Sequence, residues 1–159
     1  MQSKHLLFAL SAVTLLAVFA SCKKSNDNSS AAVSATIGGA AFNPVRTAAA
    51  HYAANGYFDL GGLGVNGKDS VLLDITIGTP FTLNKVLDNS GLVTMDYFTA
   101  TKDYYSAYGI GTATVTVTTL DSVNHKIAGT FSGTLYNSVN DKDSISVING
   151  KFNTAYTEQ

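Results

Sequence analysis

The chain has 159 residues, of which 45% are hydrophobic and 13% charged, and its formal net charge is −1. This length suits one domain with a sizeable core, and the balanced charge argues against binding to nucleic acid. The chain contains a single cysteine, so an internal disulfide is excluded and packing with backbone hydrogen bonds has to stabilise the fold.

The chain begins with an apolar run that lies between a basic start and the cysteine. The run "LLFALSAVTLLAVFA" (6–20) is shorter than the roughly 20 residues of a membrane helix, and Lys4 precedes it. This layout predicts a secretory signal over residues 1–21. The exit "FASC" resembles the bacterial lipobox, apart from Phe19, where that pattern usually has Leu. The resemblance implies that acyl chains, palmitate among them, are attached to Cys22.

The residues around the cysteine predict a lipid-anchored protein. An ordinary signal peptide with an incidental cysteine is the alternative, but Cys22 lies in a polar tract that offers no core to bury it. Two or three acyl chains would hold the protein on a membrane stably. Residues 22–32 contain almost nothing to bury and predict a flexible tether, followed by one β domain over 33–159. We expect the cell envelope, and there the outer membrane, with periplasm-facing and surface-exposed attachment both open.

From residue 33 onward the hydrophobic period is two, which is typical of β-strands. Pairs containing Gly at residues 38–39, 55–56 and 66–67 predict tight hairpins. After the third pair, the stretch "SVLLDITIG" (70–78) places residues 71, 73, 75 and 77 on one buried face and Asp74 on the opposite face.

The middle of the chain is less regular. Residues 81–83 and 93–98 predict two short strands around a loop at 88–91. A helix over 83–87 is the alternative for part of this region, although the stretch is short for a helix.

The last third alternates most clearly, in "GTATVTVTTLD", "KIAGTFSGTLYN" and "DSISVINGKFN". The doubled threonine at 118–119 predicts a β-bulge, and residues 149–150 predict a bulge or kink. Gly129 and Gly133 on the inner face predict room for a large neighbour or a sharp bend of the sheet.

Many short strands without a long helical pattern predict an all-β fold. We expect an antiparallel β-sandwich, with a closed antiparallel β-barrel as the alternative. A barrel that spans the membrane is disfavoured, because its strands would have to be longer and a lipid anchor would be redundant.

Three motifs in order carry a resemblance to a known family. The stretches "SATIGGAAFN", "TVTVTTLDSVNHKIAGTFSGTL" and "ISVINGKFN" are together similar to small lipoproteins from Bacteroidota that are classified as a domain of unknown function. The likeness covers residues 34–153. It implies a β-rich envelope lipoprotein, and it brings no catalytic residues because the family has no established activity.

Residue types that carry chemistry are few and scattered. His51 and His125 have no spacing typical of metal ligands, and Asp141 and Asp143 lack the glycine and glutamate of a calcium loop. No Gly-x-Ser-x-Gly elbow marks a nucleophile. The sequence therefore predicts no metal, no cofactor and no enzyme. A hydrolase or lyase with a dispersed polar site is the competing class, and it would need acids such as Asp59, Asp74 or Asp96 to converge with His51 in a cleft.

Tyrosines are concentrated in the segment "DYFTATKDYYSAYGIG". Their spacing fits no single strand face, so some rings are expected at the surface, where they could stack on a glycan or pack on a protein partner. The alternative is that they fill one end of the sandwich. The candidate ligand-binding residues are Tyr97, Tyr104, Tyr105 and Tyr108. The predicted function is a non-catalytic binding, accessory or structural module of the envelope.

The lipobox interpretation makes a direct prediction. Substitution Cys22→Ala removes the thiol that would carry lipid, so the protein should leave the membrane fraction or accumulate as an unprocessed precursor. Fractionation with mass measurement checks this outcome. Continued membrane attachment at the mature size would refute the interpretation.

Overall fold

The structure, a computed structural model, describes residues 32–66, 69–106 and 110–159. The predicted signal segment, Cys22 and most of the tether lie outside the described residues, as does Gly67 of the third hairpin pair. The strands are β1 (Val33–Ile37), β2 (Ala40–Phe42), β3 (Arg46–Tyr52), β4 (Tyr57–Asn66), β5 (Asp69–Gly78), β6 (Val86–Asp88), β7 (Val93–Phe98), β8 (Asp103–Ser106), β9 (Thr112–Asp121), β10 (Lys126–Asn137), β11 (Ser144–Ala155) and β12 (Thr157–Glu158). Within these ranges, no helix has the length and apolarity that a membrane span requires.

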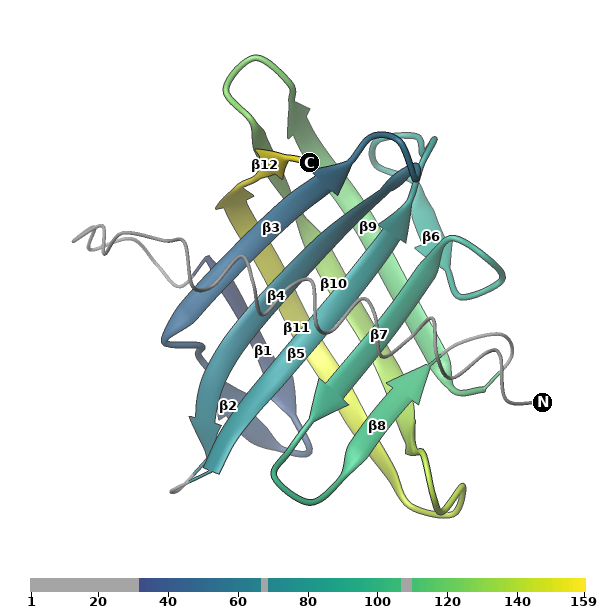
Figure 1. Ribbon diagram of the computed structural model, residues 1–159. Coiled ribbons are helices and arrows are strands. Elements are labelled where there is room, and N and C mark those ends of the chain that lie inside the picture. Colours follow the sequence, from purple (N-terminus) through teal and green to yellow (C-terminus); the bar gives the residue numbers. More distant parts are fainter. Residues whose placement is uncertain (1–31, 67–68, 107–109) are drawn as a thin grey trace.

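The strands form one sheet that folds over into two layers (Figure 1). The front layer contains β3, β4, β5, β7 and β8, and the back layer contains β6, β9, β10, β11, β1 and β2. The layers join where Tyr105 of β8 pairs with Tyr136 of β10, and again where β12, which follows β11, pairs in parallel with β3. The predicted sandwich is confirmed in this sandwich-like form. The alternative of a closed barrel is wrong, because the order of described strands has two ends, β12 and β2.

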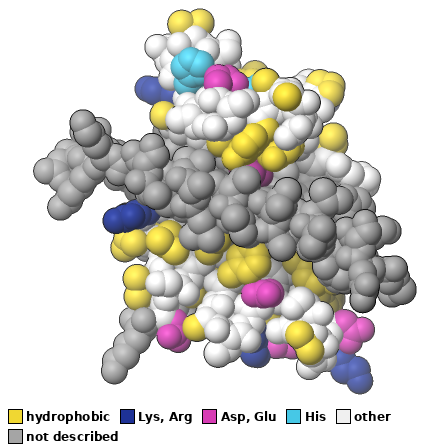
Figure 2. Space-filling view, viewed as in Figure 1, with side chains coloured by type: hydrophobic (Ala, Val, Ile, Leu, Met, Phe, Trp, Pro, Cys, Tyr) yellow, Lys and Arg dark blue, Asp and Glu magenta, His cyan; other side chains and the backbone are white. Residues whose placement is uncertain are grey.

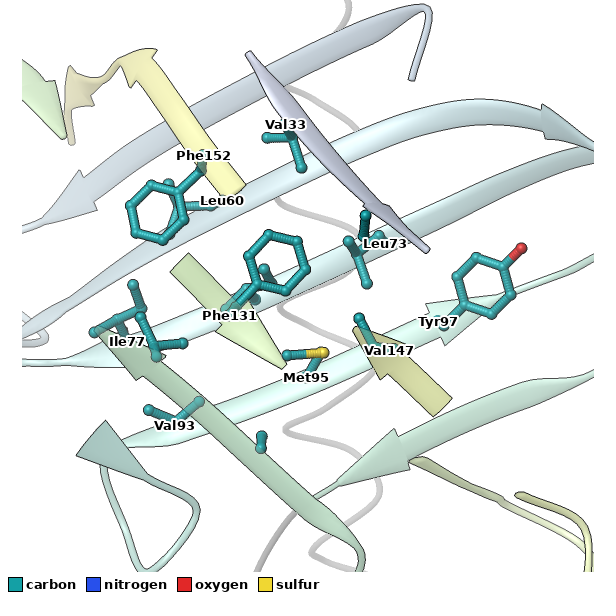
Figure 3. Close-up of a cluster of buried hydrophobic side chains, with 14 of the residues drawn as sticks. Val33, Leu60, Leu73, Ile77, Val93, Met95, Tyr97, Phe131, Val147 and Phe152 are labelled. Carbon is teal, nitrogen blue, oxygen red and sulfur yellow. The ribbon is translucent and has the colours of Figure 1, made fainter. Parts of the chain in front are cut away.

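The core lies between the layers and follows the period-two pattern of the strands. In β5, residues 71, 73, 75 and 77 are all buried in it, as their alternation predicts. Figure 3 shows Phe131 and Phe152 of the back layer among Leu60, Leu73 and Met95 of the front layer. Burial of this apolar area is the main favourable contribution to folding.

Two reciprocal pairs of glycine and phenylalanine organise the back layer. Gly129 of β10 lies opposite Phe152 of β11, and Phe131 of β10 lies opposite Gly150 of β11. Each ring covers the glycine on the facing strand, and the two rings stack with centroids 6.4 Å apart at an interplanar angle of 27°. A Cβ on Gly129 would lie 2.5 Å from Cζ of Phe152. The prediction of a large neighbour at Gly129 is confirmed.

The predicted irregularities of the last third are also present. The β9–β10 register shifts between Ala128 and Gly129, which leaves Thr118 without a partner at the doubled threonine. The β10–β11 register shifts between Phe131 and Gly133, opposite the predicted kink at 149–150. At the first predicted hairpin, Gly38 and Gly39 have positive φ values of 57° and 84°, which side chains rarely adopt.

The predicted strand over residues 81–83 is wrong. This segment forms a turn before β6, in which Asn84 has a φ of 60° and donates its backbone N–H to the carbonyl of Val117 at 2.8 Å. The turn thus bonds to the middle of β9, next to the first β6–β9 pair, and residues 81–83 themselves join no ladder. The alternative helix over 83–87 is also absent, because residues 86–88 pair with β9.

The glycine–phenylalanine pairs predict a steric effect on stability. Substitution Gly150→Ala would place a Cβ against the ring and the backbone oxygen of Phe131. We expect the free energy of unfolding to fall by about 2–3 kcal/mol, the cost of overpacking a core. Chemical denaturation measures this loss, and Asn153→Ala on the exposed face of the same strand is the control. Equal stability of the two variants would contradict the packing described here.

Candidate functional site

A groove lies on the outside of the molecule at the junction of the two layers. Along one edge, β10 pairs with β9 as far as Thr134, and from Tyr136 onward it pairs with β8. The exchange of neighbours leaves a groove of about 880 Å³. Its lining residues are Tyr105, Ile110, Gly111, Thr112, Thr134, Tyr136, Asn137, Ser138, Val139 and Asp141.

Two tyrosine rings form the wall of this groove. Tyr105 and Tyr136 are direct cross-strand partners, and both are half-buried. Side chains alternate along each strand, so both rings point outward, because the preceding residues Tyr104 and Leu135 are buried in the core. Directly opposed residues on antiparallel strands have Cβ atoms about 5 Å apart, so the two side chains leave the sheet from neighbouring positions. The pair presents apolar faces together with two hydroxyl groups.

The polar part of the groove is fixed by hydrogen bonds to backbone. The Thr112 hydroxyl accepts the N–H of Thr134 at 3.1 Å. The side-chain oxygen of Asn137 accepts the N–H groups of Val139 and Asn140 at 2.9 and 3.1 Å, which orders the loop after β10. The lining also contains two exposed apolar side chains, Ile110 and Val139, which are 43% and 93% exposed.

The structure separates the four tyrosines that the sequence singled out. Tyr97 and Tyr104 lie opposite each other on β7 and β8, only 5% and 7% exposed, so their rings fill the core. The Tyr104 hydroxyl donates to the carboxylate of Asp143 at 3.3 Å at the edge of that core. Tyr105 lies in the groove, and Tyr108 is outside the described residues.

Tyr136 is a residue of the groove that the tyrosine-rich segment could not indicate. It comes from β10, far from Tyr105 in the sequence. The side-chain alternation along β10 was the available signal. It points Phe131 and Leu135 inward and therefore points Tyr136 outward. Its pairing with β8 is a tertiary feature that the alternation does not predict.

Three carboxyl groups share the outer face of the front layer. Asp74 of β5 lies directly opposite Asp96 of β7, while Asp59 of β4 lies opposite Thr76 and accepts its hydroxyl at 2.8 Å. Burial raises the pKa of Asp59 to about 6. Burial, with Asp59 and Asp96 nearby, raises the pKa of Asp74 well above its ordinary value. Burial and the neighbouring Asp103 and Asp59 raise the pKa of Asp96 to about 7.

His51 lies on the opposite face of the front layer from these acids. Its ring stacks on Phe58 in the core with centroids 4.2 Å apart, and its Nδ1 lies 2.8 Å from Oε2 of Glu158. Glu158 also approaches Nδ1 of His125 at 3.8 Å, so the two histidines hold β12 at the end of the sandwich. The structure therefore brings the acids together but does not bring His51 to them.

The residues considered for calcium have other partners. Asp143 lies 2.7 Å from Nζ of Lys102, whereas Asp141 lines the groove. Across the described ranges, no three His, Cys, Asp or Glu side chains are grouped as metal ligands would be.

Comparison with known proteins gives one match. Residues 70–155 match the model of a family described as a domain of unknown function, DUF5025. The match runs from β5 to the end of β11 and so includes Asp74, Asp96, Tyr105 and Tyr136. No curated protein and no solved structure matches the chain.

The raised carboxyl pKa values predict a pH dependence of stability. Asp96 binds its proton more tightly in the folded chain than in the unfolded chain, so its contribution is full below about pH 4 and is lost as the pH rises through about 7. Asp96→Asn should leave stability at pH 4 similar and raise the free energy of unfolding at pH 8 by about 1–3 kcal/mol. Denaturation curves at both pH values measure this difference.

The control for this experiment is Asp69→Asn, which removes an exposed acid from the end of β5. It should leave the pH profile of stability unchanged. If Asp96→Asn and the unmodified chain showed parallel profiles between pH 4 and 8, the carboxyl group would not titrate as described.

Proposed function

The chain belongs to the family described as a domain of unknown function, DUF5025, and we propose that it is a lipid-anchored binding module of the bacterial cell envelope, of the small Bacteroidota lipoprotein type. The family supplies no activity, so the proposal depends on the chain's own residues. It has two parts, the anchor and the binding surface.

The anchor part is supported by the position of the cysteine. Cys22 follows the apolar run of residues 6–20 after one serine, and the first described strand begins at Val33. All described strands therefore follow the proposed lipid-bearing cysteine in the chain and form one domain. Attachment to the outer membrane, facing either the periplasm or the outside, belongs to this proposal.

The binding part is carried by one observation, the pairing of Tyr105 with Tyr136 across the junction of the layers. Two tyrosine side chains that line one groove provide aromatic surface on which the apolar face of a sugar ring can pack, and aromatic groups lose little conformational entropy on binding. Around the rings, Thr134, Asn137 and Ser138 supply hydroxyl and amide groups. A neutral, hydroxyl-rich glycan fits this lining, and a protein segment is the alternative ligand.

A hydrolase or lyase is the second candidate function. The observation that favours it is the cross-strand pair Asp74 and Asp96, because two adjacent acids with raised pKa values can exchange a proton with a substrate. This site would lie on the outer face of the front layer and would act without His51, which faces the core.

Arrays of glycans and peptides, probed with residues 31–159, test the binding function. This fragment contains every described strand. We expect a ligand whose affinity falls at least about tenfold, equivalent to about 1.4 kcal/mol, in both Tyr105→Ala and Tyr136→Ala. Tyr97→Phe, which alters a buried ring of the same type, should bind normally. A ligand that is unaffected by both alanine variants would place binding elsewhere, and the absence of any ligand would sink the ligand proposal.

A further inference from the structure

The outer face of the back layer carries a ladder of hydroxyl side chains on β9 and β10. The ladder consists of three consecutive cross-strand pairs, which are Thr112 with Thr134, Thr114 with Ser132, and Thr116 with Thr130. Val115 and Phe131, which alternate with these residues, are buried in the core, so the hydroxyl side chains point away from it. Successive pairs are about 7 Å apart along the strands, because each residue adds about 3.4 Å.

The hydroxyl ladder connects the groove to a second hollow. Its first pair, Thr112 and Thr134, lines the groove beside Tyr105 and Tyr136, and its other two pairs line a hollow of about 600 Å³. The groove and the hollow therefore follow one another along the same two strands. On β10 they extend from Tyr136 to Thr130, so the combined surface is about 20 Å long.

A β-bulge in β11 lies at the hollow. The register of β10 and β11 leaves Ser132 against two residues, Ile148 and Asn149, and the register of β1 and β11 shifts at the same place. Bulges bend a strand and increase its local twist. Asn149 and Gly150 line the hollow, so the bulge is part of its wall.

The ladder offers both donors and acceptors of hydrogen bonds. The Thr114 hydroxyl donates to the carbonyl of Ser132 at 3.2 Å and lies 3.0 Å from its hydroxyl, which fixes the middle pair. A hydroxyl has one donor and two acceptor sites, so capacity for a ligand remains even in this pair. Both edges of β10 are occupied here, by β9 and β11, so a peptide cannot add to the sheet as a further strand. The face presents side-chain hydroxyl groups, which suit the hydroxyl groups of a sugar.

The two ends of this surface differ in charge. At the groove, Asp141 is part of the lining and Asp143 pairs with Lys102 at 2.7 Å. Figure 2 shows acidic and basic side chains close together at this end of the molecule, which carries β8 and the β10–β11 turn. At the hollow, Lys151 is part of the lining, and no ion pair between described residues involves it. The hollow therefore presents a positive charge that an anionic ligand would neutralise.

Lys151 and Asp88 lie on opposite sides of the ladder. Lys151 of β11 pairs with Thr130, whereas Asp88 of β6 pairs with Thr114 from the other direction. The Asp88 carboxylate accepts the N–H of Ser90 at 2.9 Å. An anionic group on the ladder would be repelled on the β6 side and attracted on the β11 side.

We propose that the groove and the hollow bind one linear oligosaccharide that carries a carboxylate or a sulfate. Its rings pack at Tyr105 and Tyr136, its hydroxyl groups bond to the ladder, and its anionic group lies at Lys151. This inference rests on the proposed binding function and deepens it, because it names the ligand class as an acidic chain of several sugar units. A single neutral sugar would occupy the groove alone.

Binding of defined oligosaccharides to residues 31–159 tests this inference. The probes are hexamers of uronic acids, the same hexamers with methyl-esterified carboxylates, sulfated hexamers, and the corresponding dimers. We expect acidic hexamers to bind at least about tenfold more tightly than the neutral esters and than the acidic dimers, a difference equivalent to about 1.4 kcal/mol. Titration calorimetry measures these affinities, and the uronate and sulfate arms show which anion is bound.

Substitutions then assign the preference to residues. Lys151→Gln should abolish the preference for acidic over esterified hexamers, and Lys126→Gln, which removes the same charge at the start of β10, should preserve it. Asp88→Asn should strengthen the binding of acidic hexamers, because it removes the repulsion across the ladder. Thr116→Val combined with Thr130→Val should weaken the binding of hexamers and leave that of dimers unchanged, since it removes the hydroxyl groups of the far pair.

Several results would overturn the inference. Equal affinity for acidic and esterified hexamers, or a preference that persists in Lys151→Gln, would show that no anionic group lies at Lys151. Dimers that bind as tightly as hexamers would show that the ladder is not used. A ligand that is lost in Tyr105→Ala and Tyr136→Ala, but is unaffected by the lysine and threonine variants, would refute this inference and leave the proposed function in place. The absence of any ligand on the arrays would instead reject the proposed function itself.

Discussion

The fold depends on the way that β10 shares one of its two edges between two neighbours. A strand has only two hydrogen-bonding edges, and β11 occupies one of them over almost the whole of β10. The other edge pairs first with β9 and then with β8, so the same strand belongs to the back layer and holds the front layer. At the exchange, Gly133 closely approaches the backbone of Thr112, and Gly111 that of Thr134. Side chains there would separate the strands that have to meet.

This constraint explains why the groove and the core lie where they do. Two strands cannot occupy the same edge, so the pairing passes from the start of β9 to the end of β8, and the groove opens at this exchange. On the inner side the same junction brings Tyr104 and Leu135 into the core, which closes the sandwich at that side. The outward-pointing Tyr105 and Tyr136 are therefore consequences of a register that the core enforces, since a slip by one residue would exchange the two faces.

Much of the fold was predictable because it follows from local rules. The alternation of β5, the bulge at Thr118 and the packing of a large ring over Gly129 each depend on a side-chain period or a missing Cβ, which the sequence displays directly. The failure at residues 81–83 has a different cause. That segment is apolar enough for a strand, but the turn that follows it is held by a bond from Asn84 to Val117 in the middle of β9, a partner that is distant in the sequence.

The candidate surfaces were less predictable because they depend on strand order. The alternation shows that Asp74 faces away from the core, yet only the pairing of β5 with β7 brings Asp96 beside it. Likewise, two consecutive tyrosines on one strand must face opposite sides, but which of Tyr104 and Tyr105 is buried is decided by their partners Tyr97 and Asp96. Pairing between strands that are far apart in the chain has no signature in a single sequence.

The placement of β1 has a mechanical consequence for the lipid anchor proposed at Cys22. β1 lies between β11 and β2, with antiparallel ladders on both sides, and its first residue, Val33, is the point where tension from the N-terminal segment would enter the domain. Such tension acts along the strand, so the ladder bonds would be loaded in shear and would have to break together, whereas a strand pulled sideways opens one bond at a time. The buried side chains of Val33, Ala35 and Ile37 would have to leave the core in the same step. This geometry resists extraction of the strand that bears the load.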